Sequence, residues 1–198
     1  MTKVYIIRHT QTIGNVEKRL TGRCDYELTA EGKKYVEYLT NRFKGIAIDT
    51  SGRAMKTVLP IANMNGIKII ENEDLLEMYF GIYDGWKWEE VNKVNPKIHE
   101  LQVETNEIMT IPEQETMNEV ADRMYNCIYK LAKENENKTI MIASHGVAIE
   151  AFLRRITGEP FSIKREQYSQ KNTCVNELEF DFETNKFNVI KKKRLSQS

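Results

Sequence analysis

Two histidines directly follow two strand-like runs that lie far apart in the chain. Residues 3–7 form a short, β-branched-rich apolar run that ends at Arg8-His9, and residues 139–144 form a second run that ends at His145. Runs of this kind are typical of buried parallel strands, whose carboxyl ends form the ligand-binding edge of an open α/β sheet. The chain has only three histidines, so two in matching positions indicate a shared site.

An imidazole next to a guanidinium is suited to attack on phosphorus. The arginine fork matches the geometry of phosphate oxygens, and a neutral histidine is a usable nucleophile near pH 7. Further positive charge or N–H donors would come from Asn15, Arg53, His145 and the backbone after His145.

Phosphoryl transfer to water also needs a proton donor for the leaving oxygen. Glu77 is the candidate, because its aromatic, glycine-punctuated loop over residues 75–86 could half-bury a carboxyl group and raise its pKa. An ordinary exposed loop carboxylate is the alternative interpretation of the same residue.

Six ordered motifs resemble those of the histidine phosphatase superfamily, in its phosphoglycerate mutase-like branch. They cover nearly the whole chain and run in the family's order. They are R-H-G-x-T-x-x-N at residues 8–15, R-x-x-G-x-x-D-x-x-L-T-x-x-G at 19–32, R-A-x-x-T at 53–57, E-x-x-x-G-x-x-x-G at 77–85, S-H-G at 144–146 and N-x-x-V at 172–175.

The resemblance implies a phosphohistidine mechanism that uses neither a metal ion nor a cofactor. His9 would attack the phosphoryl group, and Glu77 would protonate the leaving alkoxide and then activate water. Substrate contacts would come from Thr21 and Gly22. The phosphate oxygens would be held by Arg8, Asn15, Arg53 and His145.

Three positions depart from the family pattern. Thr10 stands where the family usually has glycine, and a β-branched residue disfavours a positive φ there. The approach to Arg53 over residues 49–53 is shorter than usual, which indicates either a short preceding loop or a strand that lacks several residues. Gln114 replaces the glycine of the usual P-x-G-E-S motif.

Three functions are compatible with these motifs. The leading interpretation is a phosphomonoesterase acting on a small phosphorylated metabolite. A cofactor-dependent phosphoglycerate mutase is less favoured, because residues 86–111 are few and contain no arginine to hold a second phosphate. A catalytically inactive module that binds a phosphorylated ligand is the third, favoured by Thr10 but not by the presence of Glu77.

Composition narrows the class of protein further. Lysine plus arginine equals aspartate plus glutamate at 29 each, so no global field favours nucleic acid or an anionic membrane. No apolar run is long enough to span a bilayer, and we expect no signal peptide. The three cysteines are widely spaced and odd in number, which favours a reduced cytoplasm over a disulfide framework or zinc site. A homo-oligomer is compatible with the sequence.

The patterning predicts a single domain over residues 1–198, built as a three-layer α/β/α sandwich. Its sheet should be mainly parallel with an antiparallel edge strand. Pro60 should kink or divide its helix. Strands are expected at 3–7, 46–48, 68–71, 139–144 and in a hairpin at 175–182 and 187–190, with helices at 30–43, 53–62, 86–101, 117–131 and 147–156.

Overall fold

The computed structural model describes residues 1–46, 49–52, 54–96, 111–160 and 168–193, arranged around one six-stranded sheet. The strand order is β3-β2-β4-β1-β5-β6. The first four are mutually parallel, whereas β5 pairs antiparallel with β1 and β6 antiparallel with β5. The strands are β1 (Thr2–Arg8), β2 (Asp49–Gly52), β3 (Ile69–Ile70), β4 (Thr139–Ser144), β5 (Val175–Asp181) and β6 (Lys186–Lys193).

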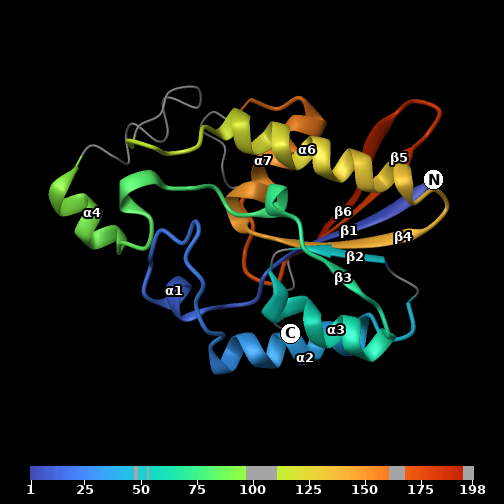
Figure 1. The fold of residues 1–198 in the computed structure, drawn as a ribbon, viewed down its shortest axis with the longest axis horizontal. Coiled ribbons are helices and arrows are strands. Elements are labelled where there is room, and N and C mark those ends of the chain that lie inside the picture. Colours follow the sequence, from blue (N-terminus) through green and yellow to red (C-terminus); the bar gives the residue numbers. More distant parts are fainter. Residues whose placement is uncertain (47–48, 53, 97–110, 161–167, 194–198) are drawn as a thin grey trace.

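Helices cover both faces of this sheet (Figure 1). On one face lie α2 (Ala30–Arg42) and α3 (Met55–Asn65), and on the other lie α6 (Met117–Glu134) and α7 (Gly146–Thr157). The short helices lie in the long loops: α1 (Ile13–Val16), the 3₁₀ turns η1 (Glu73–Leu75) and η2 (Gly81–Tyr83), and α4 (Trp88–Val94). The α/β/α sandwich with a mainly parallel sheet and an antiparallel margin is therefore confirmed.

The two central strands are buried on both faces, which explains their continuous apolar sequence. Ile6 pairs in register with Ile142, and both belong to the core beneath α6 and α7. Ile7 pairs with Ala143, and both belong to the second core beneath α2 and α3. Successive strand side chains point to opposite faces, so a strand between two helical layers needs apolar residues at every position.

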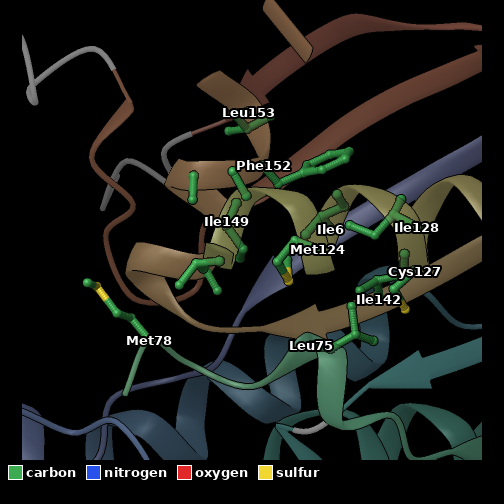
Figure 2. Packing of buried hydrophobic residues seen from close by; sticks show 14 of the residues in the cluster. Ile6, Leu75, Met78, Met124, Cys127, Ile128, Ile142, Ile149, Phe152 and Leu153 are labelled. Carbon is green, nitrogen blue, oxygen red and sulfur yellow. The ribbon is translucent and has the colours of Figure 1, made fainter. Parts of the chain in front are cut away.

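The first of these cores also holds the loop that leads to η2. Leu75 and Met78 on this loop belong to the same cluster as the α6 and α7 side chains, and Figure 2 shows Leu75 next to Cys127 and Ile142. Leu75 and Met78 are buried, at 0% and 5% exposure. The loop between β3 and η2 is thus fixed to the core on either side of Glu77.

The second strand was predicted in the wrong place. Residues 46–48 are apolar, but the strand is β2, Asp49–Gly52, which lies between β3 and β4. Residues 47–48 lie outside the described part of the chain. A polar sequence can form an inner strand because the ladder hydrogen bonds are made by the backbone.

Helix boundaries follow the capping residues closely. Thr29 and Thr116 cap α2 and α6 as their sequences indicate, each accepting the backbone N–H three residues on. Pro60 does not divide its helix, because α3 continues through it; a kink at Pro60 stays a prediction. Pro60 is exposed, so water can satisfy the carbonyl of Lys56 that the proline leaves without a donor. Of the helix expected over 86–101, only Trp88–Val94 is helical in the described residues. None of the helices described is both long and apolar enough to cross a bilayer.

Candidate active site

The register of β1 and β4 places His9 and His145 side by side. Arg8 pairs with Ser144 at the ends of these parallel strands, and the amide of His9 donates to the Ser144 carbonyl at 3.0 Å. The centroids of the two imidazole rings lie 5.2 Å apart, with the ring planes tilted by 57°. The predicted convergence of the two histidines at one carboxyl edge is confirmed.

The ring of His9 is held in one tautomer. Its Nδ1 lies 2.8 Å from the carbonyl oxygen of Thr10, and because a carbonyl can only accept, Nδ1 must carry the hydrogen. The lone pair of the neutral ring is then on Nε2. Burial lowers the pKa of His9 to about 3, and the charges of His145 and Arg8 act in the same direction. The ring is therefore neutral at physiological pH.

Thr10 adopts this position without backbone strain. It is absent from the described non-glycine residues with positive φ, so the side chain that replaces the family's glycine is accommodated. Its amide donates to Oγ1 of Thr57, at the start of α3, at 3.0 Å. Thr10 and Thr57 are both buried, at 0% and 1% exposure. Thr10 is thus bound at its N–H by Thr57 and at its C=O by the His9 ring.

Arg8 lies against the beginning of α7. A Cβ atom added to Gly146 would lie 3.0 Å from the Arg8 Cζ atom, so only glycine leaves the guanidinium its present place. Nη1 of Arg8 donates to the carbonyl of Gln170. Burial lowers the pKa of Arg8, and the nearby Glu77 side chain acts in the opposite direction. Arginine remains a cation under such shifts, so a positive charge lies next to the histidine pair.

Glu77 binds the N-terminus of the helix that follows His145. Its Oε1 accepts from the amides of Met78 and Ala148, both at 2.9 Å, and its Oε2 accepts from the amide of Val147 at 3.1 Å. These contacts satisfy two of the four N-terminal amides of α7. The carboxyl group is buried, at 6% exposure, through backbone amides rather than through the aromatic side chains that the sequence indicated.

Asn15 is tied to the backbone around His9. Its Oδ1 accepts from the amide and hydroxyl of Thr12, at 3.0 and 3.1 Å, and from Nδ2 of Asn172 at 2.9 Å. The same Asn172 amide group donates to the His9 carbonyl at 3.2 Å. The Asn15 amide nitrogen has no partner among the residues that the structure describes, so it is left to bind a ligand.

A cavity of about 310 Å³ opens at the two histidines. Thr21 and Gly22 line it, as does the start of α3; Arg8, Asn15 and Glu77 are not among its lining residues. The lining residues are His9, Thr12, Thr21, Gly22, Arg23, Cys24, Asp25, Tyr26, Leu28, Ala54, Met55, Lys56, Thr57, Glu71, Leu76 and His145.

The loop that carries Thr21 and Gly22 is held by an aspartate. The Asp84 carboxylate accepts from the amides of Gly22 and Arg23, at 2.7 and 2.8 Å, and contacts Sγ of Cys24 at 3.7 Å. This wall of the cavity is therefore anchored to η2 and its following turn.

Two further positions from the sequence motifs are Arg53 and Gln114. Arg53 lies outside the described residues, so its place as a phosphate ligand is still a prediction. Gln114, in place of the usual glycine, is buried at 6% exposure and makes a backbone bridge with Phe80. The loop takes its positive φ at Glu113 instead.

The profile of the histidine phosphatase superfamily, branch 1, matches residues 4–193. The chain belongs to this superfamily. Proteins that it resembles include a probable phosphoglycerate mutase, GpmB, of Erwinia tasmaniensis, which is 27% identical over 83% of this chain and 79% of that protein. An uncharacterized phosphatase, PhoE, of Bacillus subtilis is 29% identical over 91% of this chain and 89% of its own.

Solved structures extend the likeness to the fold. YhfR of Bacillus stearothermophilus superposes with a TM-score of 0.86 at 23% identity, over 96% of both chains. The identity is low, so this match supports the histidine phosphatase fold and does not by itself assign a substrate.

Four residues of the site were not assigned a role from the sequence. Thr57, Gly146 and Asn172 all lie inside motifs that matched the superfamily, so the motifs themselves were the available signal. Arg123 belongs to none of them and contacts the loop of Glu77 from the helix α6.

Proposed function

We propose that this histidine phosphatase family member is a phosphomonoesterase that hydrolyses a small phosphorylated metabolite through a phosphohistidine at His9. The observation that carries this proposal is the hydrogen bond from His9 Nδ1 to the Thr10 carbonyl, which leaves the Nε2 lone pair for attack. The imidazole of His145, with its centroid 5.2 Å away, supplies a second donor for the phosphoryl oxygens. A cavity of about 310 Å³ is the size of a small-ligand pocket.

In the first step His9 Nε2 forms a bond to phosphorus as the bond from phosphorus to the leaving oxygen breaks. Arg8, His145 and the Asn15 amide bind the phosphoryl oxygens, and Arg53 is expected to join them. Glu77 gives its proton to the leaving alkoxide. Because Oε1 accepts two amides and Oε2 only one, that proton must lie on the remaining lone pair of Oε2.

In the second step water attacks the phosphorus of phospho-His9. Glu77, now a carboxylate, takes a proton from that water as the P–N bond breaks. Phosphate leaves, His9 is neutral again and Glu77 again carries its proton. Fixed amides and cations supply the charge stabilisation that Mg²⁺ provides in other phosphoryl-transfer enzymes, so EDTA should leave the rate unchanged.

Hydrolysis is favoured over mutase activity by the charges around the cavity. Of its two described cationic side chains, Lys56 is bound by the carboxylates of Asp25 and Glu27, at 2.9 and 2.8 Å. Arg23 lies 3.4 Å from Glu115. These carboxylates offset the two positive charges and would repel a second phosphate. Incubation with a phosphoglycerate, with and without its bisphosphorylated form, should therefore yield inorganic phosphate and not the isomer.

Trapping the covalent intermediate tests the proposal. The protein is mixed with p-nitrophenyl phosphate, quenched, and analysed for a phosphoryl group that is labile in acid and stable in base. We expect one phosphate on His9, and none in His9→Ala. A His9→Ala protein with wild-type turnover would overturn the proposal, and a wild-type protein that binds phosphate but never turns over would indicate the inactive module. A panel of sugar phosphates, phosphoglycerates and phosphoserine then defines the substrate.

The acid role of Glu77 is tested with two leaving groups. An alkyl phosphate needs a proton on its leaving oxygen, whereas p-nitrophenolate hardly does. Glu77→Gln should slow the phosphorylation of His9 by the alkyl ester by about 10²–10⁴-fold and by the aryl ester far less. Equal losses for the two esters would show that Glu77 only shapes the site.

A further inference from the structure

Arg123 on α6 uses all five of its N–H donors, and three of them hold the loop of Glu77. Nη1 donates to the carbonyls of Asp74 and Leu76, at 2.7 and 2.8 Å, and Nη2 donates to the carbonyl of Glu77 itself at 3.1 Å. The side chain of Arg123 is only 15% exposed. One guanidinium thus binds three carbonyls within four residues of the chain.

The other two donors of Arg123 bind Glu115. Nε contacts Oε1 at 2.9 Å and Nη2 contacts Oε2 at 3.0 Å, which is a bidentate pair. Glu115 Oε2 also accepts the amide of Tyr79 at 2.7 Å. Both oxygens of Glu115 are therefore occupied, and it is a poor alternative to Glu77 as a proton donor.

This ion pair holds Glu77 from both sides along the chain. Arg123 binds the carbonyls that precede and include Glu77, while Glu115 binds the amide two residues after it. The side chains of Leu75 and Met78 fix the same loop to the core (Figure 2). Packing and the hydrogen bond from the Ser144 hydroxyl to the Leu75 carbonyl, at 2.8 Å, hold the start of the loop. The ion pair binds the backbone polar groups on either side of the Glu77 side chain, on which the orientation of that side chain depends.

We propose that the Arg123–Glu115 ion pair is a positioning device that keeps Glu77 Oε2 directed at the leaving oxygen. This inference rests on the proposed acid role of Glu77. The hydrogen bonds from Val147 and Ala148 fix the carboxyl group only while the loop backbone keeps its place. Without the ion pair the carboxyl group shifts relative to α7. Proton transfer depends on hydrogen-bond distance, so its rate should fall more than the affinity for phosphate.

The variants are Arg123→Met, which keeps the stem and removes every donor, and Arg123→Lys, which keeps the charge but not the planar fork. Asp122→Asn is the matched control on the same helix, because Asp122 forms an exposed ion pair with Arg155 at 3.1 Å. For each protein, phosphorylation of His9 by an alkyl and by an aryl phosphate is measured in a single turnover. The ratio of the two rates is unaffected by partial unfolding, because inactive protein lowers both rates equally.

We expect Arg123→Met to slow the alkyl ester about 10–10²-fold relative to the aryl ester, with a smaller change in Arg123→Lys and none in Asp122→Asn. In a Glu77→Gln background Arg123→Met should leave the ratio unchanged, since the group it positions is already gone. If Glu77→Gln changes the ratio but Arg123→Met does not, the positioning role is wrong and the acid role stands. If Glu77→Gln itself leaves the ratio unchanged, the proposed acid role fails first.

Discussion

The Nδ1 hydrogen of His9 is donated to the carbonyl of the next residue, Thr10, at 2.8 Å. Because Thr10 follows His9 directly, the nucleophile is oriented by its own backbone and needs no carboxylate partner. The orientation of the His9 ring therefore depends on the placement of the Thr10 carbonyl. The N–H of Thr10, in the peptide group before that carbonyl, donates in turn to the hydroxyl of Thr57.

The free energy of unfolding should fall as the pH becomes acidic, and part of this fall should come from His9. Its folded pKa of about 3 lies below the ordinary histidine value of 6.5, so between these pH values the unfolded chain binds a proton that the folded protein does not. The contribution of the neutral His9 ring to the free energy of unfolding is fully present above pH 6.5. It is lost as the pH falls toward 3, by at most about 1.4 kcal/mol per pH unit.

Urea unfolding at pH 7.5 and pH 5 measures this difference. The loss of unfolding free energy between the two pH values should be smaller in His9→Gln than in the wild type, by up to about 2 kcal/mol. The same loss in both proteins would show that the His9 ring already titrates normally in the fold.

Removing the hydroxyl of Thr57 should affect both stability and chemistry. In Thr57→Val the buried amide of Thr10 loses its acceptor, at a cost of about 1–3 kcal/mol, and the carbonyl that orients His9 is less well fixed. Thr57→Ser keeps the hydroxyl and should keep most of the phosphorylation rate. Thermal unfolding and single-turnover phosphorylation by p-nitrophenyl phosphate separate the two effects; equal rates in the valine and serine variants would contradict the role of the hydroxyl.

A methyl group at Gly146 should displace Arg8. The Cβ of Gly146→Ala would lie 3.0 Å from the Arg8 Cζ atom, and Nη1 of the same guanidinium is held by the Gln170 carbonyl. Gly146 begins α7 with an ordinary φ, so alanine should not lower the melting temperature. We expect kcat/KM to fall about 10-fold, on the scale of a small misplacement of a phosphate ligand. Full activity would mean that Arg8 moves aside without loss.

The position of the loop that carries Thr21 and Gly22 should depend on Asp84. Asp84→Asn replaces one acceptor oxygen by an NH₂ group that cannot accept from the amides of Gly22 or Arg23. This loosens one wall of the cavity and leaves the histidine pair in place. KM for the best substrate of the panel should rise several-fold, while the single-turnover rate at saturation changes little. A fall in that rate with KM unchanged would place Asp84 in the chemistry instead.

Local sequence was sufficient to predict a helix, strand or turn wherever the residues of one segment decide its structure. The capping threonines Thr29 and Thr116, the two apolar strands and the terminal hairpin all depend on spacing within a few residues. It failed at residues 49–52, whose polar side chains resemble a loop, because their strand exists only through pairing with β3 and β4. Pro60 does not divide α3, because its exposed position in the fold lets water satisfy the carbonyl that the proline leaves without a donor.

The sequence by itself determined the superfamily, the layered fold and the meeting of His9 with His145, since parallel strands that end in histidine must deliver them to one edge. Only the tertiary structure decided how those groups are held. Glu77 accepts amides of α7, Arg8 occupies the space that Gly146 leaves, and Arg123 binds three carbonyls of a loop about 47 residues earlier in the chain. Such contacts join segments with no fixed spacing between them, and backbone groups that act as partners are present at every residue, so no sequence pattern marks them.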